Sequence, residues 1–255
     1  MESWRKFVTA FVCGTVMVAI PAAAQADHAQ HIWDYGDSHG PSHWGELNPE
    51  YSLCSSGHHQ SPVDIRNPEK ADLPALEFDY KPSPLRIIDN GHTIMISYAP
   101  GSMLRVGGKT YELKQFHFHR PSEERINGKA YEMTVHLVHA DQQGKLAVVA
   151  VLLSKGEENS LVHELWKELP QEEGKERVLD QVSIDVAKLL PARDRGYYTY
   201  SGSLTTPPCT EDVTWFVLKQ PVAISAAEIE RFSKLYRNDA RPTQPVYDRH
   251  ILETR

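Results

Sequence analysis

The sequence has few cysteines, no run of basic residues and no periodic glycine or proline. Three Cys in 255 residues are too few for a four-cysteine zinc site or for a scaffold held by many disulfides. The 34 Asp and Glu outnumber the 27 Lys and Arg, and the resulting net charge of −7 argues against nucleic acid as the main partner. Seventeen Pro and fifteen Gly without a period exclude collagen and low-complexity sequence. The length suits one large β or α/β domain, or two small ones.

The first 26 residues have the organisation of a secretory signal peptide. Two basic residues precede an apolar stretch of about 13 residues at 8–20, and the motif Ala24-Gln25-Ala26 follows it. The stretch is shorter than the roughly 20 residues of a membrane-spanning helix. We therefore expect cleavage after Ala26, no membrane association of the mature chain, and a periplasmic or secreted location.

Cleavage would leave residues 27–255 with two cysteines, Cys54 and Cys209. An even pair in an oxidising compartment favours one disulfide between them, although two buried free thiols would also fit. Such a bridge would close a loop of roughly 155 residues and contribute on the order of 4–5 kcal/mol, less any strain.

Short segments of alternating polarity predict antiparallel strands in the middle of the chain. Turn signals such as Asn90-Gly91, Gly107-Gly108 and Asn127-Gly128 separate them, at a spacing that suits hairpins better than βαβ units. The expected strands are 85–88, 93–98, 103–106, 110–120, 132–140, 146–153 and 213–218.

Two amphipathic helices are expected, at 159–169 and 225–237. In the second, Ser225 and Glu228 have the spacing of a capping box. Residues 27–66 show no period and predict an irregular surface segment. Because no internal repeat or long linker divides the chain, residues 27–255 are predicted to form a single α+β domain dominated by one antiparallel sheet.

The most informative segment is Gln115-Phe116-His117-Phe118-His119. Residues two apart on a strand share a face, so His117 and His119 are predicted to lie together. A third ligand would come from the next strand, where parity lets only one of His136 and His139 join them. Three imidazoles with one open position are the arrangement of a catalytic zinc. Core or surface histidines without a metal are the alternative.

A second metal-site interpretation is a cupin, because His117, His119 and Glu123 have the spacing of the first cupin motif. Cupins also have a second block that contains Gly and Pro and ends in His. No such block is found downstream.

Five motifs follow one another along the chain: QSPVDI at 60–65, NGH at 90–92, QFHFH at 115–119, HLVH at 136–139 and YSGSLTTPPC at 200–209. Together they resemble the α-class carbonic anhydrases, specifically the exported bacterial type, and the resemblance covers about residues 33–250. It implies an α+β fold with a large twisted, mostly antiparallel β-sheet and a few surface helices. It also implies zinc-dependent, reversible hydration of CO₂ to bicarbonate and a proton, and it allows a homodimer.

Matching positions carry the family's roles to this chain. Zn²⁺ would be bound by His117, His119 and His136, with His139 on the other face. Thr205 would accept a hydrogen bond from zinc-bound hydroxide and donate its own proton to Glu123.

The remaining roles also come from the resemblance. His92 would shuttle protons, which suits an imidazole with a pKa near 6.5. The expected water network is Tyr35, Asn90 and Gln115. The expected substrate pocket is Val138, Val148, Leu204, Thr206, Val213 and Trp215, although plain core packing would explain most of these residues as well.

The chain departs from the family two residues before the third ligand, where Thr134 replaces the usual glutamate. A hydroxyl can accept the same hydrogen bond but lacks the charge, and the loss of such a partner typically costs about 10–100-fold in metal affinity or activity. Glu132 has the right parity but lies too far along the strand. We therefore expect weaker zinc binding with activity retained. Glu124 stands where the family often has His or Asn, and we expect it to repel Glu123.

A non-catalytic carbonic-anhydrase-like protein that binds a metal or a partner is the alternative function. Loss of a ligand histidine would favour it, whereas all three histidines are present.

Overall fold

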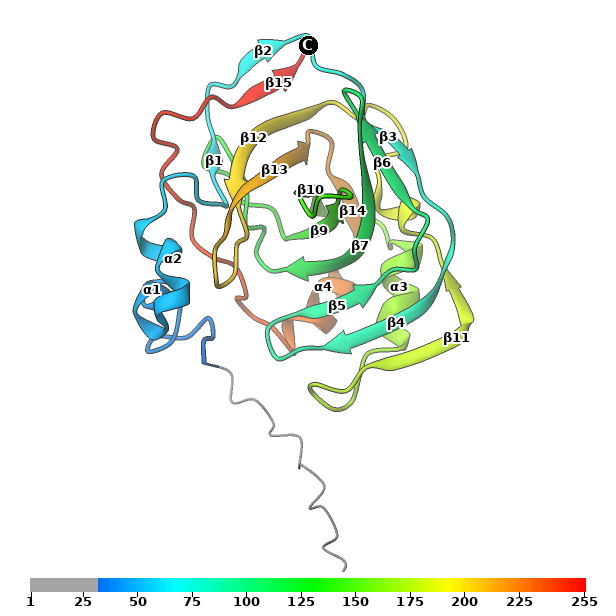
Figure 1. The fold of residues 1–255 in the computed structure, drawn as a ribbon. Coiled ribbons are helices and arrows are strands. Elements are labelled where there is room, and N and C mark those ends of the chain that lie inside the picture. The colour runs from blue at the N-terminus through cyan, green and yellow to red at the C-terminus, as the bar shows by residue number, and fades with distance from the viewer. Residues whose placement is uncertain (1–31) are drawn as a thin grey trace, which may run out of the picture. The chain divides into compact units, whose positions relative to one another are not determined.

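The computed structural model describes residues 32–255 (Figure 1), so the expected signal peptide at 1–26 lies outside the described residues. Within residues 32–255, no helix combines the length and apolar character needed to cross a membrane. The helices are α1 (Trp44–Leu47), α2 (Leu53–Ser56), α3 (Ser160–Lys167) and α4 (Ala226–Ser233), with 3₁₀ turns η1 (Pro49–Tyr51) and η2 (Val186–Leu189).

A mixed sheet of 13 strands dominates the described part of the chain, and β1 and β8 form a separate pair. Its longest path runs β11-β4-β5-β7-β9-β10-β13-β12-β15-β2, with β3, β6 and β14 attached beside it. The strands are β1 (Asp64–Ile65), β2 (Glu69–Ala71), β3 (Glu77–Asp79), β4 (Ser83–Asp89), β5 (Ile94–Ser97), β6 (Met103–Val106), β7 (Lys109–His119), β8 (Arg125–Ile126), β9 (Met133–Ala140), β10 (Leu146–Lys155), β11 (Arg177–Ile184), β12 (Tyr197–Ser203), β13 (Glu211–Leu218), β14 (Val222–Ile224) and β15 (Leu252–Thr254).

The predicted α+β class with a mostly antiparallel sheet is confirmed. All seven predicted strands exist, and all of their ends agree within two residues. Four pairings are parallel: β10 with β13, β10 with β14, β15 with β2, and β1 with β8. Eight strands were not predicted: β11, β12 and the short β1, β2, β3, β8, β14 and β15. The segment predicted to be irregular contains α1 and α2.

Both predicted helices form, and the second has its expected capping box. The Asn159 side chain accepts hydrogen bonds from two backbone N–H groups at the start of α3, and Ser225 and Glu228 make a capping box at α4. The helix predicted to reach residue 237 ends at Ser233. Both helices contribute to the larger core on one face of the sheet, where Trp166 of α3 packs on Phe118 with ring centroids 4.9 Å apart.

Strand alternation divides the sheet into two buried faces. Phe116 and Phe118 of β7 join the core beneath α3 and α4. Along β10 the alternate residues Val148, Ala150 and Leu152 join a second cluster on the opposite face. Because both faces are covered, β10 is an almost continuous apolar run. After the irregularity between Leu113 and Gln115, the odd-numbered residues at the end of β7, from Gln115 to His119, therefore face away from the helices.

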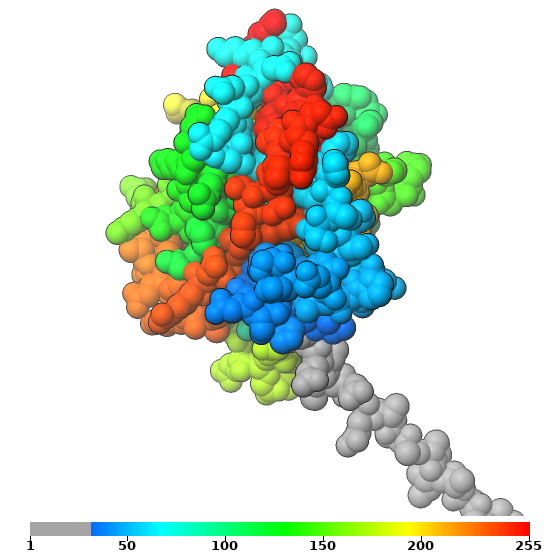
Figure 2. All heavy atoms as spheres, turned by 90° about the vertical axis from the view of Figure 1, so that its left-hand side faces the viewer, coloured from blue at the N-terminus to red at the C-terminus, as the bar shows by residue number. Residues whose placement is uncertain are grey.

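The predicted disulfide joins Cys54 to Cys209, with Cα atoms 5.0 Å apart. Beside it, the buried Arg241 side chain donates hydrogen bonds to the Cys54 and Ser61 carbonyls and to Gln60 Oε1, each at 2.8 Å. Figure 2 shows the N-terminal helices lying against the C-terminal segment that carries Arg241. The disulfide thereby ties α2 to the loop between β12 and β13.

Replacing both cysteines, Cys54→Ala with Cys209→Ala, is expected to lower the free energy of unfolding by about 4–5 kcal/mol, because the unfolded chain loses a cross-link that spans 155 residues. Guanidinium unfolding at equilibrium measures this change. Reduction of the wild-type chain should produce a loss of similar size, and equal stability of oxidised and reduced chains would contradict the prediction.

Candidate metal centre

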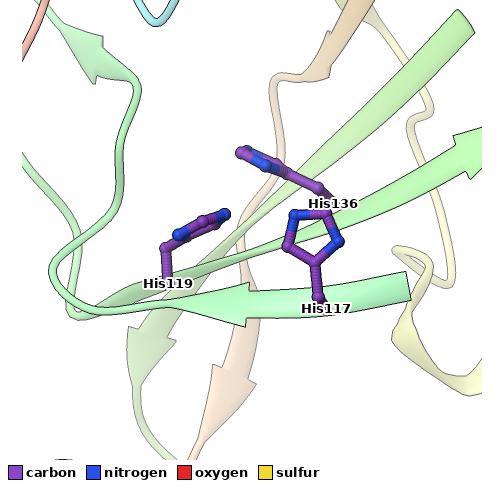
Figure 3. A group of neighbouring side chains, drawn as sticks. All are labelled: His117, His119 and His136. Carbon is purple, nitrogen blue, oxygen red and sulfur yellow. The ribbon is translucent and has the colours of Figure 1, made fainter. Parts of the chain in front are cut away.

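Strands β7 and β9 bring three imidazoles together on one face of the sheet (Figure 3). Their antiparallel register places His117 directly opposite His136, with His119 two residues further along β7. One ligand nitrogen from each ring lies within 4.8 Å of the others. His139 faces the other way, where its Nε2 is 2.7 Å from the Tyr80 hydroxyl. The geometry thus selects His136 and leaves out His139, as strand parity predicted.

Each of the three imidazoles is held through one ring nitrogen by an oxygen atom. A carboxylate or carbonyl oxygen only accepts hydrogen bonds, so the bonded ring nitrogen donates and the second nitrogen keeps its lone pair. The contacts are His117 Nδ1 to Gln115 Oε1 at 2.8 Å, His119 Nδ1 to the Asp239 carbonyl at 2.7 Å, and His136 Nε2 to Glu124 Oε1 at 2.8 Å.

The lone pairs left over suit a metal ion. His119 Nε2 is buried and has no hydrogen-bond partner within residues 32–255. Burial lowers the pKa of His117 to about 3 and holds that of His119 well below its usual value, so both rings are neutral. Burial also lowers the pKa of His136, but Glu124 and Glu123 outweigh it and the net shift is upward. Three imidazoles with one open position match a catalytic zinc site.

Glu123 lies beside this cluster and is almost fully buried. Its Oε1 accepts the backbone N–H of Arg241 at 2.7 Å, and its Oε2 is 3.6 Å from His119 Nε2. Burial raises the pKa of Glu123 to about 7, while His136 and hydrogen bonds from Arg241 and Thr205 oppose the rise. The structure therefore places the predicted pair, Glu123 and Thr205, together next to the imidazoles.

His92 is fixed at the turn between β4 and β5. Asn90 Oδ1 accepts the backbone N–H of His92 at 3.0 Å and that of Thr93 at 2.9 Å. The His92 ring stacks on Trp33, with centroids 3.6 Å apart and planes within 7° of parallel. Tyr35 packs edge-on against the same indole at 5.7 Å. Sequence reasoning missed the contact between Trp33 and His92, because nothing local in the chain indicates it.

The family model described as eukaryotic-type carbonic anhydrase matches residues 39–255. The chain belongs to this family. A carbonic anhydrase of a Nostoc species is 42% identical over 226 residues, which cover 87% of this chain and 85% of the relative. This membership makes the chain an enzyme of the carbonic anhydrase type and excludes the cupin interpretation.

Solved carbonic anhydrases have the same fold. A hyperthermostable carbonic anhydrase from an active hydrothermal vent chimney superposes with a TM-score of 0.84 at 45% identity, covering 88% of this chain and all of the other. The α-carbonic anhydrase of Thermovibrio ammonificans, solved with the inhibitor sulfanilamide, gives 0.82 at 43% identity over 86% of this chain and 98% of its own.

Most residues expected to form the carbonic anhydrase substrate pocket lie in one apolar cluster next to His136. The Trp215 ring packs edge-on against His136 with centroids 4.9 Å apart. Thr206 is half-buried in the adjoining loop. The cluster contains the expected residues Val148, Val213 and Trp215 at its centre, with Val138 and Leu204 packed against it.

The expectation that Thr134 is the partner of the third ligand is wrong. The Thr134 hydroxyl donates to the Val151 carbonyl of β10 at 3.3 Å, and the His136 ring is held by Glu124. Sequence reasoning missed Glu124 because it lies twelve positions before His136, outside the strand. Glu124 also raises the pKa of its neighbour Glu123, as two adjacent acids should.

His136→Ala is expected to remove stoichiometric zinc from the chain, because two imidazoles alone do not make a tight site. The loss of affinity should exceed the roughly 10–100-fold that follows from losing an outer hydrogen-bond partner. Metal content after dialysis against a weak chelator measures it. His139→Gln, on the opposite face of the same strand, is the matched control and should retain zinc; equal zinc in both variants would contradict the assignment.

Proposed function

We propose that this chain hydrates CO₂ reversibly to bicarbonate and a proton, using a zinc ion held by His117, His119 and His136. The observation that carries the proposal is the set of three imidazoles, each held by an oxygen acceptor through one nitrogen with the other nitrogen turned toward its neighbours. Membership in the carbonic anhydrase family supports the choice of reaction.

Zinc in this position supplies Lewis acidity, and a bound-water pKa of about 7 is the established value for carbonic anhydrase. Thr205 orients the nucleophile. Because a carboxylate at Glu123 accepts only, the Thr205 hydroxyl donates to it and has only lone pairs left for the attacking group. The backbone N–H of Arg241 holds Oε1 of Glu123 in place.

The apolar cluster beside His136 receives the substrate. CO₂ is small and has no net dipole, so it gains from a surface of Val148, Val213 and Trp215 with Val138 and Leu204 at its edge. Bicarbonate is charged and leaves such a surface readily, because its hydration is lost there. The half-buried Thr206 adds a polar hydroxyl at the edge of this surface.

His92 carries the released proton toward solvent. Histidine is the side chain that exchanges a proton most readily near neutral pH, and the backbone N–H of His92 is held by Asn90. Tyr35, Asn90 and Gln115 are the groups we assign to ordering the water between His92 and the metal centre. The Trp33 ring gives the His92 side chain a defined resting position.

The same proposal includes export of the chain. The disulfide between Cys54 and Cys209 requires an oxidising compartment to persist, which supports a periplasmic or secreted protein. A homodimer is compatible with this location.

The proposed function is tested by measuring metal content and stopped-flow CO₂ hydration on one preparation. We expect one zinc per chain and hydration that is lost on chelation, restored by zinc and inhibited by sulfanilamide, which occupies a structural relative. Zinc binding without hydration would refute the proposal in favour of a non-catalytic metal-binding protein.

His92→Ala tests the proton transfer. We expect a large loss of CO₂ hydration in dilute buffer and recovery in concentrated buffer of small imidazoles, because a soluble base replaces the missing side chain. His163→Ala, on the surface of α3, is the matched control and should behave as the wild-type chain in both buffers. A His92→Ala rate equal to wild type in dilute buffer would disprove the role.

A further inference from the structure

A carboxylate from the loop before β8 holds the third ligand, His136, although position 134 on its own strand has no acid. Glu124 lies in the segment between β7 and β8, and its Oε1 is 2.8 Å from His136 Nε2. It is fully buried, and so is His136. The second oxygen of Glu124 is buried without a hydrogen-bond partner within the described residues. The His136 ring therefore donates the hydrogen bond that this buried carboxylate accepts.

The backbone around Glu124 is tied down on both sides. The Ser122 hydroxyl donates to the Glu124 carbonyl and accepts the backbone N–H of Tyr131, both at 2.8 Å. On the other side, Arg125 begins β8, which pairs with β1. The carboxylate thus reaches His136 from a fixed position, as a group that orients a ligand must.

Glu124 differs in charge from the acceptors of the other two imidazoles. His117 is held by the neutral amide of Gln115 and His119 by a backbone carbonyl. A carboxylate fixes the tautomer, as those acceptors do, and in addition raises the basicity of the ligand. The bond at Nε2 leaves Nδ1 of His136 as the nitrogen that faces the cluster.

We propose that Glu124 is the positioning residue of the third zinc ligand and takes the role that an acidic side chain at position 134 would have. This inference rests on the proposed zinc site. Because the Glu124 carboxylate holds the His136 ring, no charged side chain is needed at position 134, and the Thr134 hydroxyl bonds the Val151 carbonyl of β10 instead. The chain is then not a weak zinc binder, which corrects the expectation drawn from Thr134 alone.

The first test follows zinc release into excess EDTA from the zinc-loaded enzyme. Glu124→Gln keeps the size of the side chain and removes its charge, and we expect release about 10–100-fold faster than wild type. Glu132→Gln removes an exposed carboxylate just before β9 and is the matched control, with release at the wild-type rate.

The second test exchanges the two side chains, Glu124→Thr with Thr134→Glu. Gln115 and His117 show that a side chain two residues before a ligand on this face can reach its ring, at 2.8 Å. We expect Glu124→Thr alone to release zinc rapidly and the exchanged variant to return close to the wild-type rate. If Glu124 served only the folding of its loop, a glutamate at position 134 on β9 would not restore slow zinc release.

The inference would be overturned if Glu124→Gln released zinc at the wild-type rate. It would also be overturned if the exchanged variant released zinc as fast as Glu124→Thr. Circular dichroism of the zinc-free variants checks folding, and Glu124→Asp, which keeps the charge, should fall between wild type and Glu124→Gln if Glu124→Thr does not fold. Zinc retention without CO₂ hydration in the wild-type chain would refute the proposed function and leave this inference intact. If the wild-type chain hydrates CO₂ and Glu124→Gln retains zinc as well as wild type, this inference is refuted and the proposed function stands.

Discussion

The antiparallel register between β7 and β9 is the constraint on which the rest of the site depends. It sets His117 opposite His136, and strand alternation adds His119 to the same face. A slip of one residue would turn every side chain of a strand to the other face. Phe116 and Phe118 oppose such a slip, because they are fully buried in the core that α3 and α4 complete. The packing of one face thus determines the chemistry of the other.

The three imidazoles are oriented by segments that lie far apart in the chain. Gln115 comes from β7 itself, the Asp239 carbonyl from the segment after α4, and Glu124 from the loop before β8. The segment after α4 is held in turn by Arg241, which binds the N-terminal region next to the disulfide. Because the imidazole orientations depend on all of these segments, the centre is complete only when most of the domain has folded.

The features that could be predicted from the sequence are those set by local periodicity. Alternation predicted the face shared by His117 and His119, and the capping-box spacing of Ser225 and Glu228 predicted where α4 begins. Strand β11 was missed because half of its residues are exposed and its sequence lacks a clear apolar alternation. The helix α4 was predicted too long because Tyr236 continues its apolar stripe, whereas the Tyr236 hydroxyl instead bonds Asp89. Non-local contacts of this kind leave no pattern in a single segment.

Glu124 shows the same limit at the site itself. A partner of a metal ligand is defined by its position in space, so counting back from His136 finds Thr134 and interprets it as a loss. The negative charge comes from the loop that carries Glu123 and Glu124. Glu123 bonds the Arg241 backbone and Thr205, whereas Glu124 bonds the His136 imidazole. Two buried carboxylates are costly without compensation. The zinc ion proposed for the three imidazoles would supply a charge of matching size, and its presence would explain why adjacent acids are tolerated in this core.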